Sequence, residues 1–94
     1  MKLFKFYKDF NTGQNHFLKH NVSESEIIEF FNDINYFEHK RKDNSFIGIG
    51  KLLSNRYLKI IYRKESKETY FIIIAYDIED QTWIDYIDKN LEDQ

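Results

Sequence analysis

The chain of 94 residues contains no cysteine, no proline and three glycines. Without cysteine it can form neither a disulfide, nor a thiolate zinc site, nor a thiol nucleophile. It contains no apolar run of the length that a membrane-spanning helix needs, about 18 residues, and residues 1–8 lack the unbroken apolar stretch of a secretory signal. It also has no glycine-rich phosphate loop. We therefore expect a cytoplasmic protein without a cofactor and without a membrane span.

The length and composition predict one small domain covering residues 1–94, with a core supplied largely by aromatic side chains, which make up 18% of the sequence. The net charge is −2, but the charges are segregated. Residues 40–64 hold eight basic residues against one acid, and residues 77–93 hold seven acids against one base. This asymmetry can build a local positive field on an acidic protein, or it can reflect two ordinary solvated surfaces.

Two N-terminal helices are predicted. The first covers residues 12–20, with Asp9 or Asn11 as its cap, and ends at Asn21, a residue that tolerates the left-handed conformation. The second begins at Ser23, because Ser23 and Glu26 form the Ser-x-x-Glu pattern of a capping box. Apolar residues recur at helical spacing through this helix, which should end near residue 32 or 33.

Four strands are predicted over residues 36–42, 46–51, 56–64 and 69–76, and residues 3–7 are expected to form a short strand or an extended arm. The short polar connections imply antiparallel neighbours, and the last strand is apolar on both faces, which favours a central position. A final helix over residues 80–91 should bury Trp83, Ile84, Ile87 and Leu91. The expected fold is α+β, with two N-terminal helices, a four-stranded antiparallel sheet and a C-terminal helix.

Tyr57, Lys59 and Arg63 alternate along the third strand and should therefore share one face, with His39 and Arg41 on a neighbouring strand. Cations hold phosphates, tyrosine rings stack on unpaired bases, and histidine can move the proton of a ribose 2′-hydroxyl during strand scission. The pattern therefore indicates an RNA-binding or RNA-cleaving surface. A solvated sheet face would show the same alternation.

A metal site is not expected. His16 and His20 are spaced four residues apart, as two ligands on one helical face would be, but no third ligand accompanies them.

The order of these segments resembles the BrnT-type toxins of the RelE-like superfamily, or a related group of small domains with the same outline. The likeness covers residues 9–78. It is carried by Lys-His-Asn-Val-Ser at 19–23, Ile-Gly-Ile-Gly at 47–50, Asn-Arg-Tyr-Leu-Lys-Ile-Ile-Tyr at 55–62 and Phe-Ile-Ile-Ile-Ala-Tyr at 71–76. Each motif is short, and their order and spacing make the case.

The resemblance implies a metal-independent endoribonuclease that halts translation and is held inactive by an antitoxin protein. It carries over Arg56 by position. The candidate catalytic residues are Arg56, Lys59 and Arg63, which would hold phosphate, and His39, which would move a proton. The candidate RNA-binding residues are Tyr57, Arg41 and Tyr76.

The chain departs from the family at Phe71, Tyr76 and Ser45, where the family has arginine, and at Thr12 and Lys8, where it has lysine and tryptophan. The loss of these cations keeps a second hypothesis open, a catalytically degenerate protein-interaction module of the same fold. The aromatic surplus would also suit a homodimer.

Overall fold

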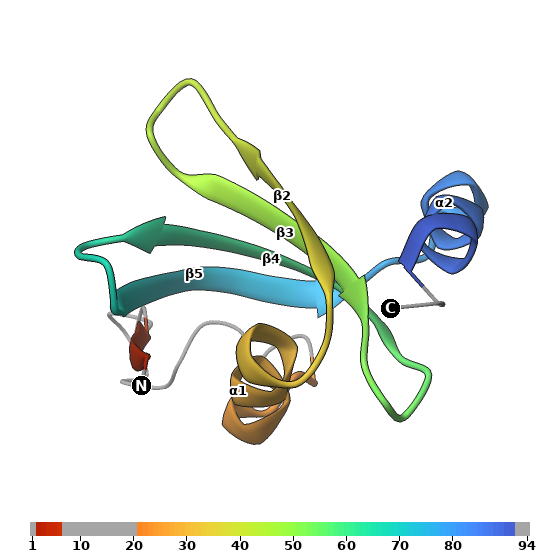
Figure 1. Cartoon of the computed structure of the whole chain (residues 1–94), viewed down its shortest axis with the longest axis horizontal. Coiled ribbons are helices and arrows are strands. Elements are labelled where there is room, and N and C mark those ends of the chain that lie inside the picture. The colour runs from red at the N-terminus through yellow and green to blue at the C-terminus, as the bar shows by residue number, and fades with distance from the viewer. Residues whose placement is uncertain (1, 7–20, 92–94) are drawn as a thin grey trace.

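The computed structural model describes residues 2–6 and 21–91, which form one five-stranded sheet with two helices (Figure 1). The elements follow in the order β1 Leu3–Phe6, α1 Glu24–Asn32, β2 Tyr36–Lys40, β3 Phe46–Lys51, β4 Tyr57–Lys64, β5 Thr69–Asp77 and α2 Gln81–Leu91. The strands lie in the order β1-β5-β4-β3-β2. The α+β class predicted from the sequence is therefore confirmed.

The prediction of a four-stranded, purely antiparallel sheet is wrong, because β1 adds a fifth strand parallel to β5. The Leu3 N–H donates a 2.6 Å hydrogen bond to the Glu68 carbonyl, and Phe4 and Phe6 turn toward the core. Four residues are too few for periodicity to decide between a strand and an arm. The interior position predicted for β5 is confirmed. The helix predicted over residues 12–20 lies outside the described residues.

The start of α1 confirms the predicted capping box. Ser23 is the N-cap with extended backbone; its Oγ accepts from the Glu26 N–H at 3.2 Å, and its own N–H donates to Glu26 Oε1 at 2.9 Å. Asn21 has a φ of 60°, the left-handed conformation expected there. The helix ends at Asn32, with Asp33 as its C-cap, as predicted.

The core lies between α1 and one face of the sheet. The fully buried Phe30 ring packs directly over Gly48 and Gly50, where Cβ atoms would lie only 3.1 and 3.2 Å from its ring carbons. These two glycines share a face of β3, and they allow the helix to approach the sheet backbone. Phe31, Tyr36, Tyr62 and Tyr70 surround the contact with further rings.

Helix α2 lies at the end of the sheet, on the side opposite α1 (Figure 1). Ile87 is 1% exposed, but Trp83 is 50% exposed. Ile84 and Leu91 are partly buried. The prediction that Trp83 is buried is therefore wrong: helical spacing placed it on the apolar stripe, whereas the helix contacts the sheet mainly through β3. Within residues 2–6 and 21–91, neither helix has the length and apolar character needed to cross a membrane.

Candidate functional site on the α2 face of the sheet

The two faces of the sheet differ in what covers them, and we call them the α1 face and the α2 face. On β4, Leu58, Ile60 and Tyr62 are fully buried on the α1 face. The intervening residues, which include Lys59 and Arg63, are half-buried or exposed and lie on the α2 face. The predicted division of this strand into two faces is confirmed.

Strand register aligns the α2-face side chains in three rows across the sheet. The first row contains Phe37, Ile49, Lys59 and Tyr76. The second row contains His39, Ile47, Ile61 and Ile74. The third row contains Arg63, Phe71 and Lys5. Each row therefore combines at least one basic or imidazole side chain with apolar or aromatic neighbours.

A groove of about 890 Å³ runs between α2 and the first two rows, and we call it the α2 groove. It brings together three predicted site residues, His39, Lys59 and Tyr76. The Lys59 Nζ lies 5.6 Å from the centroid of the Tyr76 ring, close enough for a cation–π interaction. The remaining lining is Phe37, Glu38, Ile47, Ile49, Asp77, Ile78, Glu79, Asp80, Thr82, Trp83 and Tyr86.

Arg63 and Arg41 lie beyond the groove, toward the β2–β3 hairpin, and both are exposed. They are close enough to Asp43 to help lower the pKa of its carboxyl, although the largest effect comes from hydrogen bonds donated by Ser45. The Ser45 Oγ donates to Asp43 Oδ1 at 2.5 Å, and Ser45 is fully buried. Ser45 thus organises the hairpin through Asp43.

Tyr57 points to the α2 face, but α2 holds it in place. Its hydroxyl donates a 2.6 Å hydrogen bond to Asp88 Oδ1, and the Lys51 Nζ lies 5.5 Å from its ring centroid. The expectation that Tyr57 shares an open surface with Lys59 and Arg63 is therefore wrong. Sequence reasoning placed the strand face correctly but could not place the helix against it.

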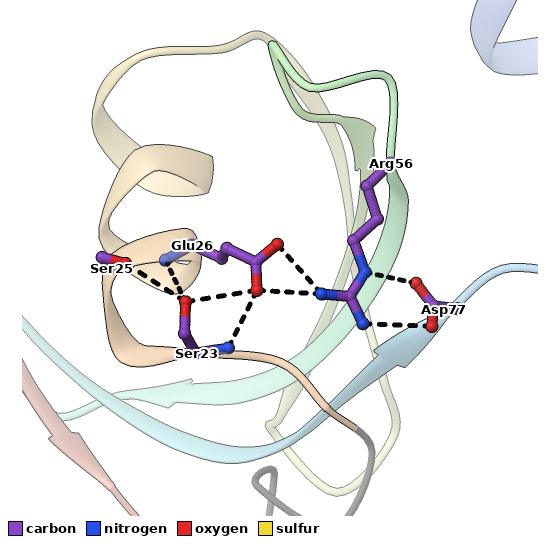
Figure 2. A network of polar contacts seen from close by, with 5 residues as sticks. All are labelled: Ser23, Ser25, Glu26, Arg56 and Asp77. Carbon is purple, nitrogen blue, oxygen red and sulfur yellow. Dashed lines mark hydrogen bonds and ion pairs between the residues drawn. The ribbon is translucent and has the colours of Figure 1, made fainter.

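Arg56 lies away from this surface, in an ion-pair network that joins α1 and β5 to the residue just before β4 (Figure 2). Its Nε donates to Asp77 Oδ1 at 2.6 Å and its Nη2 to Asp77 Oδ2 at 3.1 Å. Its Nη1 reaches both Glu26 oxygens at 2.8 and 2.9 Å. The prediction groups Arg56 with Lys59 and Arg63, but the structure does not bring them together. Arg56 instead has two carboxylates as partners.

The network sets the charge states of its members. The hydrogen bond from Arg56 lowers the pKa of Asp77 below its ordinary value of 3.8, although burial opposes this. Burial alone would raise the pKa of Glu26, but hydrogen bonds from the Ser23 N–H and Arg56 outweigh it, and the net pKa is lowered. The hydrogen bond with Asp77, and then that with Glu26, raises the pKa of Arg56. All three groups are therefore charged at neutral pH.

A second polar cluster, on the α1 face, was missed by sequence reasoning. The buried Tyr62 hydroxyl donates to Glu38, whose other oxygen accepts from the Lys64 Nζ at 2.7 Å. Burial, with smaller effects from Tyr70 and Glu38, raises the pKa of Tyr36 to about 12. The sequence signal that could have found this cluster is the period-two alternation of β2, which places Tyr36 and Glu38 on one face. Glu38 therefore links the buried Tyr62 hydroxyl to the Lys64 ammonium, and Glu38 and Lys64 form an ion pair.

No three histidine, aspartate or glutamate side chains within the described ranges are grouped as metal ligands would be. His16 and His20 lie outside those ranges. Comparison with protein-family models, with curated proteins and with solved structures finds no match to this chain. Functional inference therefore rests on the geometry of the α2 face.

Proposed function

We propose that this chain is an RNA-binding protein of the toxin-like kind that its motifs resemble, acting in the cytoplasm through the α2 face of its sheet. One observation carries the proposal: register places Lys59, His39 and Arg63 in three successive rows, beside Tyr76 and apolar neighbours. Cations bind the sugar-phosphate backbone, and aromatic rings stack on unpaired bases. The surface thus has the groups that single-stranded RNA requires.

Strand scission is the chemistry that the groove supports best. His39 would take the proton of a ribose 2′-hydroxyl while that oxygen attacks the adjacent phosphorus and the bond to the 5′-oxygen breaks. The ammonium of Lys59, in the same groove, would stabilise the charge that develops on the phosphoryl oxygens. Water would then protonate the leaving 5′-oxygen. Arg63 and Arg41 would hold phosphates of the flanking nucleotides.

Purified protein incubated with total RNA tests both parts of the proposal. The wild-type chain should bind and cleave RNA, His39→Ala should bind but not cleave, and Arg63→Ala should bind more weakly. Lys89→Ala, which removes an exposed cation on α2, is the matched control and should behave as wild type. RNA left intact and unbound at high protein concentration would rule the proposal out.

A second candidate function is the non-enzymatic protein-interaction module. The observation that favours it is the position of Arg56, the family arginine, whose guanidinium is bound by Glu26 and Asp77 rather than presented on the α2 face. Expression in a bacterium separates the two candidates. Growth arrest that disappears with His39→Ala supports the nuclease, whereas unaffected growth together with intact RNA supports the interaction module.

A further inference from the structure

The α2 groove displays four aromatic side chains from three elements: Phe37 on β2, Tyr76 on β5, and Trp83 and Tyr86 on α2. The ring centroids of Phe37 and Tyr86 are 4.8 Å apart, and those of Trp83 and Tyr86 are 6.0 Å apart. Trp83 remains 50% exposed and Tyr86 46% exposed. Tryptophan and tyrosine are the residues that most often dominate the binding energy of protein interfaces.

Carboxylates line the same groove, and two of them have no cationic partner in the described part of the chain. Asp77 is paired with Arg56 and Glu38 with Lys64. Glu79 and Asp80, in the connection between β5 and α2, form no ion pair with residues 2–6 or 21–91. Asp80 instead accepts the Thr82 N–H at 2.8 Å as the cap of α2. One end of the groove therefore combines uncompensated negative charge with exposed aromatic rings.

This combination favours a cation with an apolar stem. A lysine ammonium or an arginine guanidinium is attracted both to carboxylates and to the faces of aromatic rings, and its methylene stem packs on apolar walls. The chain already contains one such arrangement in the groove, where the Lys59 ammonium lies over the Tyr76 ring. At this end of the groove, RNA phosphates would be repelled by Glu79 and Asp80, whereas the rows with His39 and Lys59 carry the opposite charge.

We propose that the Trp83 end of the α2 groove binds an amphipathic helix of a partner protein, which presents lysine or arginine beside apolar residues. The volume of about 890 Å³ accommodates several side chains of such a helix, as helix-in-groove recognition requires. Charge complementarity selects the occupant, because the rim is acidic. This site is additional to RNA binding: it depends on Trp83, Tyr86 and Glu79 at one end of the groove. RNA binding depends instead on the rows that carry His39, Lys59 and Arg63.

Trp83 is the single tryptophan of the chain, so its fluorescence reports directly on the groove. The probes are two synthetic amphipathic peptides of about 15 residues, the length at which isolated helices become stable, one built from leucine and lysine and one from leucine and glutamate. The full-length chain should bind the leucine–lysine peptide with a shift in Trp83 emission. It should bind the leucine–glutamate peptide about tenfold more weakly.

Substitutions then separate the aromatic part from the charged part. Trp83→Phe and Trp83→Ala, followed by calorimetry, should weaken the leucine–lysine peptide by about twofold and about tenfold respectively. Glu79→Gln should reduce the preference for lysine over glutamate by about threefold, whereas the matched change Asp85→Asn, on α2 outside the groove, should leave it unchanged. Ile28→Ala, which removes an exposed apolar side chain from α1, controls for non-specific binding.

Equal binding of both peptides, or binding of neither, would overturn this inference, and so would a Trp83 shift that single-stranded RNA produces and neither peptide does. The last outcome would mean that the rings stack on bases and not on a protein. These results are distinguishable from a failure of RNA binding, because RNA binding is measured by comparing wild type with Arg63→Ala and uses neither peptide.

Discussion

The two faces of one sheet differ in how their polar groups are partnered. On the α1 face the charged side chains are matched to one another: Arg56 with Glu26 and Asp77, and Lys64 with Glu38. On the α2 face, His39 and Lys59 line a groove, and Arg63 lies exposed beyond it. Matched charges hold elements together, whereas charges at an accessible surface are available to a ligand. The α1 face therefore holds the fold together, and the α2 face is the one at which we propose that a ligand binds.

The largest difference between the faces should appear when one phenylalanine is removed from each. Phe30 is fully buried between α1 and the sheet. The substitution Phe30→Ala should lower the unfolding free energy by about 3–5 kcal/mol, because it leaves a cavity above Gly48 and Gly50. Phe37→Ala, on the partly covered α2 face, should cost about 1–2 kcal/mol. Urea unfolding measures both. Equal losses would mean that the core is not confined to the α1 face.

The next effect compares two arginines on opposite faces, Arg56 just before β4 and Arg63 near its end. Arg56→Ala should lower the unfolding free energy by about 2 kcal/mol, because it leaves Glu26 and Asp77 without their cation, and partial exposure of Asp77 keeps the loss moderate. Arg63→Ala should change it by about 0.5 kcal/mol or less. Thermal unfolding of the two variants, side by side with wild type, decides the ranking. A larger loss from Arg63→Ala would reverse the assignment of the two faces.

The Arg56 network should also make stability depend on acid. The pKa values of Glu26 and Asp77 are lowered in the folded state, so their contribution is complete above the unfolded values near 4 and is lost as the pH falls through the folded values. Wild-type unfolding free energy should therefore fall as the pH drops below about 4. Arg56→Ala should flatten this dependence, and a variant curve parallel to that of wild type would contradict the network.

The smallest expected effect concerns the salt dependence of RNA binding. Loss of one phosphate contact from a single strand should reduce the slope of log affinity against log salt concentration by about 0.7. Arg63→Ala should show this change, measured by fluorescence anisotropy with a labelled oligonucleotide. Arg56→Ala, compared at a temperature where both variants are folded, should keep the wild-type slope. A reduced slope for Arg56→Ala would mean that RNA binds near Arg56, on the α1 face.

Local patterns predicted the fold more fully than they predicted the site. Ser23 and Glu26 fixed the start of α1, because capping depends on residues three apart in the chain. Strand alternation placed Lys59 and Arg63 on one face for the same reason. The parallel pairing of β1 with β5 joins residues 66 positions apart, such as Leu3 and Thr69, and no local pattern encodes it.

The contact partners of individual side chains could not be predicted from local patterns either. Arg56 contacts Glu26, 30 residues away, and Tyr57 contacts Asp88, 31 residues away. Both contacts depend on where α1 and α2 pack, and helix packing follows from the whole core rather than from spacing. The sequence therefore indicated which residues face one way, but not which of them are already bound to a partner.

Chemical-shift mapping with a short single-stranded RNA tests the division between the two faces most directly. In a two-dimensional amide spectrum of the intact chain, the residues that move on RNA addition should be those of the three rows, above all His39, Lys59, Arg63 and Tyr76. The amides of Phe30, Gly48 and Ile60 should stay in place. Shifts concentrated around Glu26 and Arg56, with the three rows unmoved, would contradict the account.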